Sequence, residues 1–409
     1  ARDAHARNIG GPVRRPAVRI AVLLLLLVHA PRAARADGFL GDGIIENTDS
    51  QQSGILATAI GTDGFYIAGL DYTAGTGSWR VEKRRLDDGE LVPSFGDGGV
   101  VAVDPTMGWD GIQNILVEGE SLFLVGSADT GLRIEKRSAR SGRLKTLFGA
   151  AGAVSAPAEQ PLFLSSNYAA LARGNLYVAT DSGRILRIRA DTGELVGALR
   201  TASPSAPEYV AALAAGPAAL FVGMATPQGF RLEKLGLHRG RVLWQVDEPF
   251  TQAGCWPEAP LTIALVPGSL VLGGTREGLW HIERRRRRDG APVWSVTETG
   301  RGDCDAVYDI VVDRDAFFAV GVHNSRRRIE KRRLADGALL EQFGNGGVID
   351  GTRRTLEAFS AVKACGDLVV SGWASSVGEP TRWYSTRHDP TSGALAVEPR
   401  TACTERTRR

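Results

Sequence analysis

The sequence predicts an all-β protein: a seven-bladed β-propeller of four-stranded antiparallel blades, closed by an N-terminal strand in the last blade. Three observations support this prediction. A short apolar strand that ends in a small residue recurs seven times, a turn glycine follows each copy, and a segment resembling a blade end stands before the first repeat. Internal repeats of this length indicate a repeat architecture rather than separate domains.

The recurring apolar strand is the clearest part of the repeat. Each copy is rich in Val, Leu, Phe or Tyr and is too short for a helix, so it is typical of a buried strand. The seven copies are 65–69, 122–126, 176–180, 220–223, 270–273, 317–321 and 368–372.

A charged strand follows in most repeats and runs into a turn glycine. Its pattern, as in Arg80-Val81-Glu82-Lys83, places Arg and Glu on one face, where they would either pair between neighbouring blades or face solvent. The turn glycines lie 47 to 56 residues apart, which is room for four short strands. They are Gly89, Gly142, Gly193, Gly240, Gly290, Gly337 and Gly393.

Such a small sheet exposes apolar faces that it buries only against another copy, so seven copies favour a closed ring. The segment 39–45 resembles the blade ends 95–101 and 343–349. We therefore expect a closing strand within 37–49 to complete the seventh blade. The predicted blades are 53–105, 106–157, 158–204, 205–254, 255–302, 303–351 and 352–400, followed by a tail, 401–409.

The first 36 residues have the pattern of a secretory signal peptide. Basic residues precede an apolar run, 20–28, and Ala34-Arg35-Ala36 fits a small-residue cleavage site. The run is too short to span a bilayer. We expect a secreted or periplasmic protein without a membrane span, the alternative being that 20–28 is a buried element. The net charge of +3 on 409 residues argues against nucleic acid as a partner.

Two repeat families resemble this chain. The Leu-x-x-Asp-Gly-x-Leu-x-x-x-Phe-Gly-x-x-Gly-Val runs at 86–100 and 334–348 resemble the delta-60 type repeat of bacterial propellers. The Gly-x-x-x-Trp endings at 240–244 and 290–294 are similar to pyrroloquinoline-quinone-like (quinoprotein-like) repeats. The resemblance covers most of 37–400 and implies a propeller, but one fold hosts many functions.

Four cysteines lie in the second half of the chain, where an exported protein retains disulfides. Cys255 and Cys304 are 49 residues apart, close to one repeat, so we pair them across adjacent blades. That leaves Cys365 with Cys403, which would attach the C-terminal tail to blade seven. Free thiols or a metal site are the alternatives, although no Cys-x-x-Cys spacing supports zinc.

Candidate binding residues combine aromatic surface with polar tips on loops near the ring interior. They are Trp109, Asp110, Tyr168, Tyr209, Trp256, Asp305, Tyr308, Asp309 and His323. Packing between blades would explain most of them equally well. The carboxylates around Tyr308 are the best local candidate for a cation or polar ligand, with turn capping as the alternative. The run 284–288 is either a solvated outer strand or a contact for an anionic partner.

Catalytic motifs are missing from the sequence. Its histidines after the leader occupy unrelated positions, and neither Gly-x-Ser-x-Gly nor His-Glu-x-x-His occurs. The sequence therefore favours a monomeric, non-enzymatic propeller that binds an unknown protein or polysaccharide through its loop face, without cofactor or metal. The alternative is a quinone-dependent oxidoreductase-like or lactonase-like propeller enzyme.

Overall fold

The computed structural model describes residues 38–47, 53–72, 76–106, 108, 110–129, 131–156, 167–180, 183–200, 209–250, 259–299, 304–351, 356–375, 380–400 and 403. These residues belong to one compact unit, 37–409. The predicted signal peptide, 1–36, lies outside the described residues.

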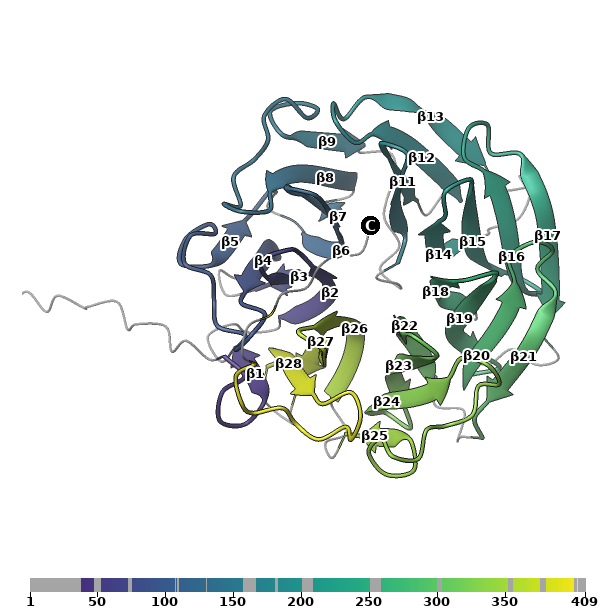
Figure 1. Cartoon of the computed structure of the whole chain (residues 1–409). Coiled ribbons are helices and arrows are strands. Elements are labelled where there is room, and N and C mark those ends of the chain that lie inside the picture. Colours follow the sequence, from purple (N-terminus) through teal and green to yellow (C-terminus); the bar gives the residue numbers. More distant parts are fainter. Residues whose placement is uncertain are drawn as a thin grey trace, which may run out of the picture. The chain divides into compact units, whose positions relative to one another are not determined.

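Within these ranges the chain forms 28 strands in seven four-stranded antiparallel sheets, set as blades around a central axis (Figure 1). This confirms the predicted fold class. Blades one to three comprise β2(Gly54–Ile60), β3(Phe65–Asp71), β4(Ser78–Arg84), β5(Val100–Val103); β6(Gly111–Glu118), β7(Ser121–Ala128), β8(Gly131–Ser138), β9(Ala153–Ala156); and β10(Ala169–Ala172), β11(Asn175–Ala179), β12(Arg184–Arg189), β13(Leu195–Arg200). Blades four and five comprise β14(Tyr209–Ala215), β15(Ala219–Thr226), β16(Gly229–Gly236), β17(Val242–Pro249); and β18(Pro260–Val266), β19(Ser269–Arg276), β20(Leu279–Arg286), β21(Pro292–Thr297). Blades six and seven comprise β22(Ala306–Asp313), β23(Ala316–His323), β24(Arg326–Arg333), β25(Val348–Asp350); and β26(Leu356–Ala364), β27(Asp367–Ala374), β28(Arg382–His388), β1(Ile44–Asn47).

The N-terminal strand closes the ring as expected. β1 pairs antiparallel with β28, with Ile45 opposite Ser385, and so becomes the outermost strand of blade seven. Blade seven therefore contains strands from both ends of the described chain (Figure 1).

The apolar second strands form the cores between blades. Tyr66 of β3 and Leu122 of β7 are fully buried and belong to one cluster that joins blades one and two. Full burial of a large apolar side chain contributes roughly 1.5–3 kcal/mol. Since each cluster needs two blades, no blade buries its apolar faces alone.

A bulge in the innermost strand explains the small residue that ends most second strands. A Cβ atom on Gly69 would lie 1.9 Å from the carbonyl oxygen of Gly54, and one on Gly126 would lie 2.0 Å from that of Gly111. Only glycine permits this approach of two backbones. The extra residues at the bulges, in six blades, are Leu56, Gln113, Ala211, Leu261, Tyr308 and Phe359.

The charged third strands carry buried ion pairs within a single strand. In blade two, Glu135 is fully buried between Arg133 and Arg137, with nitrogen–oxygen distances of 2.7 and 2.6 Å. Arg137 also donates to the carbonyl oxygen of the turn residue Gly142, at 2.8 Å. Blades one and six repeat this arrangement around Glu82 and Glu330. The pairs of these three triplets thus lie within one strand and are not solvated charge, and Arg332 of the blade-six triplet also pairs with Glu298 of blade five.

A further cation in each blade lies one residue before the position that the second arginine occupies in the triplets, and it links neighbouring blades. Each donates a hydrogen bond to a main-chain oxygen in the turn of the following blade. The seven bonds are Lys83 to Ala139 (3.0 Å), Lys136 to Ala190 (2.6 Å), Arg187 to His238 (2.8 Å), Lys234 to Arg287 (3.0 Å), Arg284 to Leu334 (3.0 Å), Lys331 to Pro390 (2.5 Å) and Arg387 to Asp87 (2.5 Å). The last bond completes the circle.

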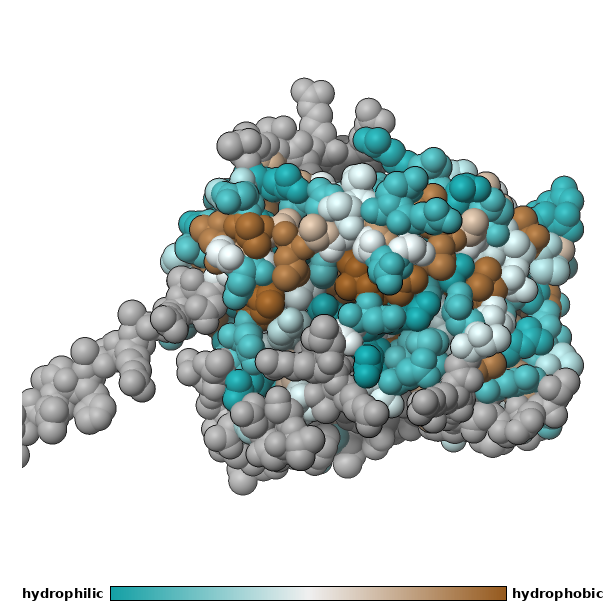
Figure 2. All heavy atoms as spheres, turned by 90° about the horizontal axis from the view of Figure 1, so that it is seen from below, coloured by the Kyte–Doolittle hydropathy of each residue, from teal (hydrophilic) through white to brown (hydrophobic). Residues whose placement is uncertain are grey.

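The outer wall carries scattered apolar side chains. Figure 2 shows one side of the molecule, where apolar residues lie in several separate areas among polar ones. The large apolar residues exposed in the described ranges are Leu40, Leu147, Leu195, Leu243, Val293 and Leu395. Exposed apolar residues spread in this way are ordinary for a soluble surface.

Candidate functional site: an aromatic cluster at the ring axis

Three aromatic rings follow one another at the axis, from blade six into blade seven. The ring centroids of Tyr308 and Phe359 are 4.7 Å apart in a stacked arrangement, and those of Phe359 and Trp373 are 4.7 Å apart and T-shaped. All three side chains are half-buried. With Asp309 and Ser360 they form what we call the axial cluster.

Two β-bulges determine the positions of Tyr308 and Phe359 in this cluster. Tyr308 and Phe359 are the extra residues in the innermost strands β22 and β26. A bulge interrupts the alternation of side chains and re-aims a residue that a regular strand would point elsewhere. Trp373 is fixed from blade one, because a Cβ atom on Gly54 would lie 2.7 Å from its Cε3 atom. The cluster therefore belongs to blades six and seven and packs against blade one.

Asp309 is the carboxylate of the cluster and accepts several neutral hydrogen bonds. The main-chain N–H groups of Ile310 (2.8 Å) and Ala361 (2.9 Å) and the hydroxyl of Ser360 (3.2 Å) donate to it. Burial raises the pKa of Asp309 above its usual range, although these bonds and one from Asn167 oppose the shift. The ionised carboxylate is thus costly here, because the hydrogen bonds do not fully replace its hydration.

Polar contacts extend the cluster across the axis. The amide Nδ2 of Asn167, at the start of blade three, donates to the main-chain oxygen of Tyr308 in blade six, at 3.4 Å. On the other side, the N–H of Thr58 in blade one donates to Ser360 Oγ, at 3.0 Å. Residues from four blades therefore hold one another in place at the axis.

Two of the nine sequence-predicted residues, Tyr308 and Asp309, belong to this cluster. Tyr209 lies nearby, since it and Tyr308 pack against the same small apolar group of blades four to six, which includes Ala211 and Leu261. Trp109 and Trp256 lie outside the described residues.

The other predicted residues support the blades. Asp110 accepts from the N–H of Asp129 and Asp305 from that of Asn324, both at 2.6 Å, so these carboxylates cap the turns between second and third strands. His323 lies beside Asp305, its Nε2 being 3.6 Å from Oδ2. Tyr168 is fully buried, and its hydroxyl donates to Gln113 Oε1, at 2.8 Å. The contacts of these four residues are therefore those of turn capping and of packing between blades, which were the alternatives to ligand binding.

Sequence reasoning missed Phe359, Ser360 and Trp373. No motif marks them, because their position depends on a bulge and on packing against Gly54 of a distant blade. An alignment of the repeats would have indicated Phe359. When Gly321 of blade six is aligned with Gly372 of blade seven, Phe359 occupies the position of Tyr308.

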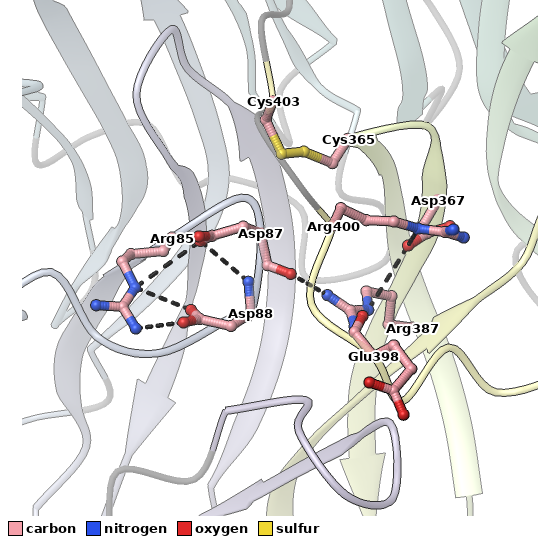
Figure 3. The surroundings of a disulfide bond; sticks show 9 residues. All are labelled: Arg85, Asp87, Asp88, Cys365, Asp367, Arg387, Glu398, Arg400 and Cys403. Atoms are coloured by element: carbon pink, nitrogen blue, oxygen red, sulfur yellow. Dashed lines mark hydrogen bonds and ion pairs between the residues drawn. A yellow bond between two sulfur atoms is a disulfide. The ribbon is translucent and has the colours of Figure 1, made fainter.

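The predicted disulfide between Cys365 and Cys403 is present (Figure 3), with Cα atoms 5.3 Å apart. Cys304 is also disulfide-bonded. Its expected partner, Cys255, lies outside the described residues, so that pairing stays a prediction.

The arginine run 284–288 mostly serves the fold. Arg284 links to blade six, and Arg285 is buried against Glu283, at 2.7 Å. The guanidinium of Arg287 lies 5.4 Å from the ring centroid of Phe221. The remaining two, Arg286 and Arg288, are exposed and pair with Asp289. Neither an anionic partner nor a wholly solvated strand is needed to explain the run.

The described ranges contain no group of three or more His, Cys, Asp or Glu residues that could hold a metal ion. They also contain no helix with the length and apolar character that a bilayer crossing requires.

Fold and site together define a seven-bladed β-propeller with an aromatic cluster at its axis. No family model and no curated protein matches the chain. Among solved structures, BamB from Moraxella catarrhalis is similar over 84% of this chain and 96% of its own, at 12% identity and a TM-score of 0.43. The computationally designed Ika8 protein is similar over 82% and 98%, at 14% identity and a TM-score of 0.46. The delta-60 repeat type stays a prediction.

Proposed function

We propose that this chain is an exported, monomeric binding protein that takes a protein or glycan ligand at the axial cluster. The observation that carries the proposal is the run of three half-buried rings, Tyr308, Phe359 and Trp373, in contact with one another. Rigid aromatic side chains bury much area on binding at a low cost in conformational entropy, and they dominate many interfaces.

Export is supported by two features. The apolar run 20–28 follows basic residues and precedes a small-residue site. The disulfide between Cys365 and Cys403 persists in an oxidising compartment.

The contacts of the cluster favour binding over turnover. Ser360, the one serine in it, donates directly to Asp309 and meets the hydroxyl of Thr58, at 2.8 Å. Activation of a serine nucleophile needs a base such as histidine within hydrogen-bond reach. The contacts found here instead fix the two strands β22 and β26 relative to each other.

The test uses the mature protein, beginning at Asp37, on a glycan array and a peptide array. We compare wild type with Phe359→Leu and Trp373→Leu, which keep an apolar side chain but remove a ring. A ligand bound at the cluster should lose about tenfold in affinity in either variant, because one stacked ring contributes up to about 1.5 kcal/mol.

Trp244→Leu serves as the matched control. Trp244 lies half-buried on the outer strand β17, with its indole N–H donating to the main-chain oxygen of Arg287. This variant should bind like wild type, and thermal melting must show that all three variants fold. Array ligands that bind both cluster variants as tightly as wild type, or an absence of any ligand on both arrays, would refute the proposal.

A further inference from the structure

A small cavity lies between blades four and five. Its lining includes Phe230 of β16, Pro260 of β18, Gly274 of β19, and His281 and Glu283 of β20, all of which are buried. The volume of the cavity is about 10 Å³, and one buried water molecule requires about 10–15 Å³. The cavity therefore has room for one water molecule and for no larger ligand.

The cavity lies where blade five departs from the repeat. In blades one, two and six, an arginine stands opposite the second-strand glycine and donates to the buried glutamate of its own strand. These arginines are Arg80, Arg133 and Arg328. In blade five the residue opposite Gly274 is His281. Because imidazole is shorter than an arginine side chain and Gly274 adds no side-chain atoms, space remains beside Glu283.

Blade four lacks a second donor for the same space. At the next junction, the indole N–H of Trp280 in blade five donates to Glu330 of blade six, at 3.1 Å. Phe230 occupies the position of Trp280 in blade four, directly before the first residue of the charged pattern, and it has no N–H group. Glu283 accepts one bond at each carboxylate oxygen from Arg285, at 2.7 and 2.8 Å. A carboxylate has about four acceptor sites, so each oxygen of Glu283 keeps one.

His281 places an unpaired polar atom at this cavity. Its Nδ1 atom is hydrogen-bonded to the hydroxyl of Thr297, at 2.8 Å, whereas its Nε2 atom is buried without a hydrogen-bond partner among the described residues. Nε2 lies 3.8 Å from Oε2 of Glu283, which is too long for a direct hydrogen bond but short enough for one water to bond both atoms. Buried polar atoms in native proteins are nearly always paired, with protein groups or with ordered water.

The chemistry of His281 favours water over a cation. If Nδ1 donates to Thr297, then Nε2 is an acceptor, and if Nδ1 accepts, then Nε2 carries the proton. Water bonds Nε2 in both cases because it donates and accepts, whereas an ammonium ion only donates. The described ranges also contain no group of three or more acidic, histidine or cysteine side chains that could hold a metal ion.

We infer that blade five binds a structural water molecule, which donates to Glu283 Oε2 and bonds His281 Nε2. This water takes the part that an arginine guanidinium and an indole N–H play at other blade junctions. The described residues of the axial cluster do not line the cavity, so the inference is independent of the proposed function.

A high-resolution crystal structure of the mature protein tests the inference directly. We expect one ordered water peak within about 3 Å of both Glu283 Oε2 and His281 Nε2. Absence of density between these atoms would overturn the inference, and so would a peak that appears only in crystals grown with an ammonium salt. This measurement needs no variant to fold.

Two variants test the site in solution. His281→Arg and Phe230→Trp each restore a donor that other blades have, so each should expel the water. Relaxation dispersion of isotope-labelled water counts the long-lived bound water molecules, and we expect each variant to hold one fewer than wild type. Arg189→Met, on the surface of blade three, is the control and should keep the wild-type count. Thermal melting must show that the variants fold, and an unchanged count in both folded variants would refute the site.

Discussion

Arg387 in the last blade donates from Nη1 to the main-chain oxygen of Asp87 in the first blade, at 2.5 Å (Figure 3). Its Nε and Nη2 atoms donate to the main-chain oxygens of Ala396 (3.0 Å) and Glu398 (2.5 Å). One fully buried side chain thus joins blade one, blade seven and the C-terminal segment. It completes the series of seven cation-to-turn bonds that begins at Lys83.

Arg387→Met should destabilise the ring strongly. Three main-chain oxygens lose their donor, one in a buried bond and two in part-buried bonds, and an unsatisfied buried acceptor costs about 1–3 kcal/mol. We expect the free energy of unfolding in urea to fall by at least about 3 kcal/mol. Arg189→Met is the control, because Arg189 pairs with Glu194 on the surface and should change stability by less than about 1 kcal/mol. Similar losses in the two variants would contradict the closing role of Arg387.

Glu135→Gln tests the buried triplet of blade two. The substitution leaves Arg133 and Arg137 beside a neutral group, and breaking a buried ion pair typically costs about 3–5 kcal/mol. The urea midpoint should therefore drop well below that of Glu194→Gln, which removes an exposed partner of Arg189. A midpoint within error of wild type would show that the triplet does not stabilise the blade.

His388 should make stability depend on pH. Burial and the nearby Arg327 cation lower the pKa of His388 to about 4, despite a hydrogen bond with the oxygen of Gly393. In the unfolded chain the pKa of His388 is near 6.5, so the unfolded state binds the proton of His388 more tightly than the folded state does. The contribution of His388 to the free energy of unfolding is therefore complete above about pH 6.5 and is lost as the pH falls towards 4. At pH 4.5 the loss from this group is about 2.5 kcal/mol.

His388→Gln should remove that part of the slope. Urea unfolding at pH 7.5 and pH 4.5 would show a smaller difference for the variant than for wild type, while the carboxylates contribute equally to both. Equal pH slopes in the two proteins, or a measured pKa of His388 near 6.5, would contradict the prediction.

The disulfide should stabilise the ring without being needed for it. Cys365 and Cys403 are 38 residues apart, and a crosslink over such a loop contributes roughly 3–4 kcal/mol in the chain-entropy model. Because β1 still closes blade seven, Cys403→Ser should lower the melting temperature but keep the β-sheet circular dichroism spectrum. Loss of the native spectrum would mean that the bridge, not β1, holds the ring together.

The fold could be predicted because its signals are local and repeated. The apolar strand 65–69 and its six counterparts mark the second strands, and the likeness of 39–45 to 95–101 indicated the closing strand. The ion-pair partners of the charged residues in the third strands could not be derived from the repeat pattern. Alternation places Arg133 and Glu135 on one face, but it does not say whether that face is buried or which residue they meet.

The site was only partly predictable for a related reason. Tyr308 and Asp309 stand out in sequence as an aromatic residue beside carboxylates. Phe359 and Trp373 acquire their positions from a bulge and from a contact with Gly54, some 300 residues away. Asp305 looked equivalent to Asp309 in sequence but caps a turn, because it precedes the strand that carries the bulge.

The most direct test of the account is a crystal structure of the mature protein with its tightest array ligand. We predict ligand density at the axis, in contact with Phe359 and Trp373. Density elsewhere, for example along the outer strands β13, β17 or β21 with the axial rings unoccupied, would contradict it.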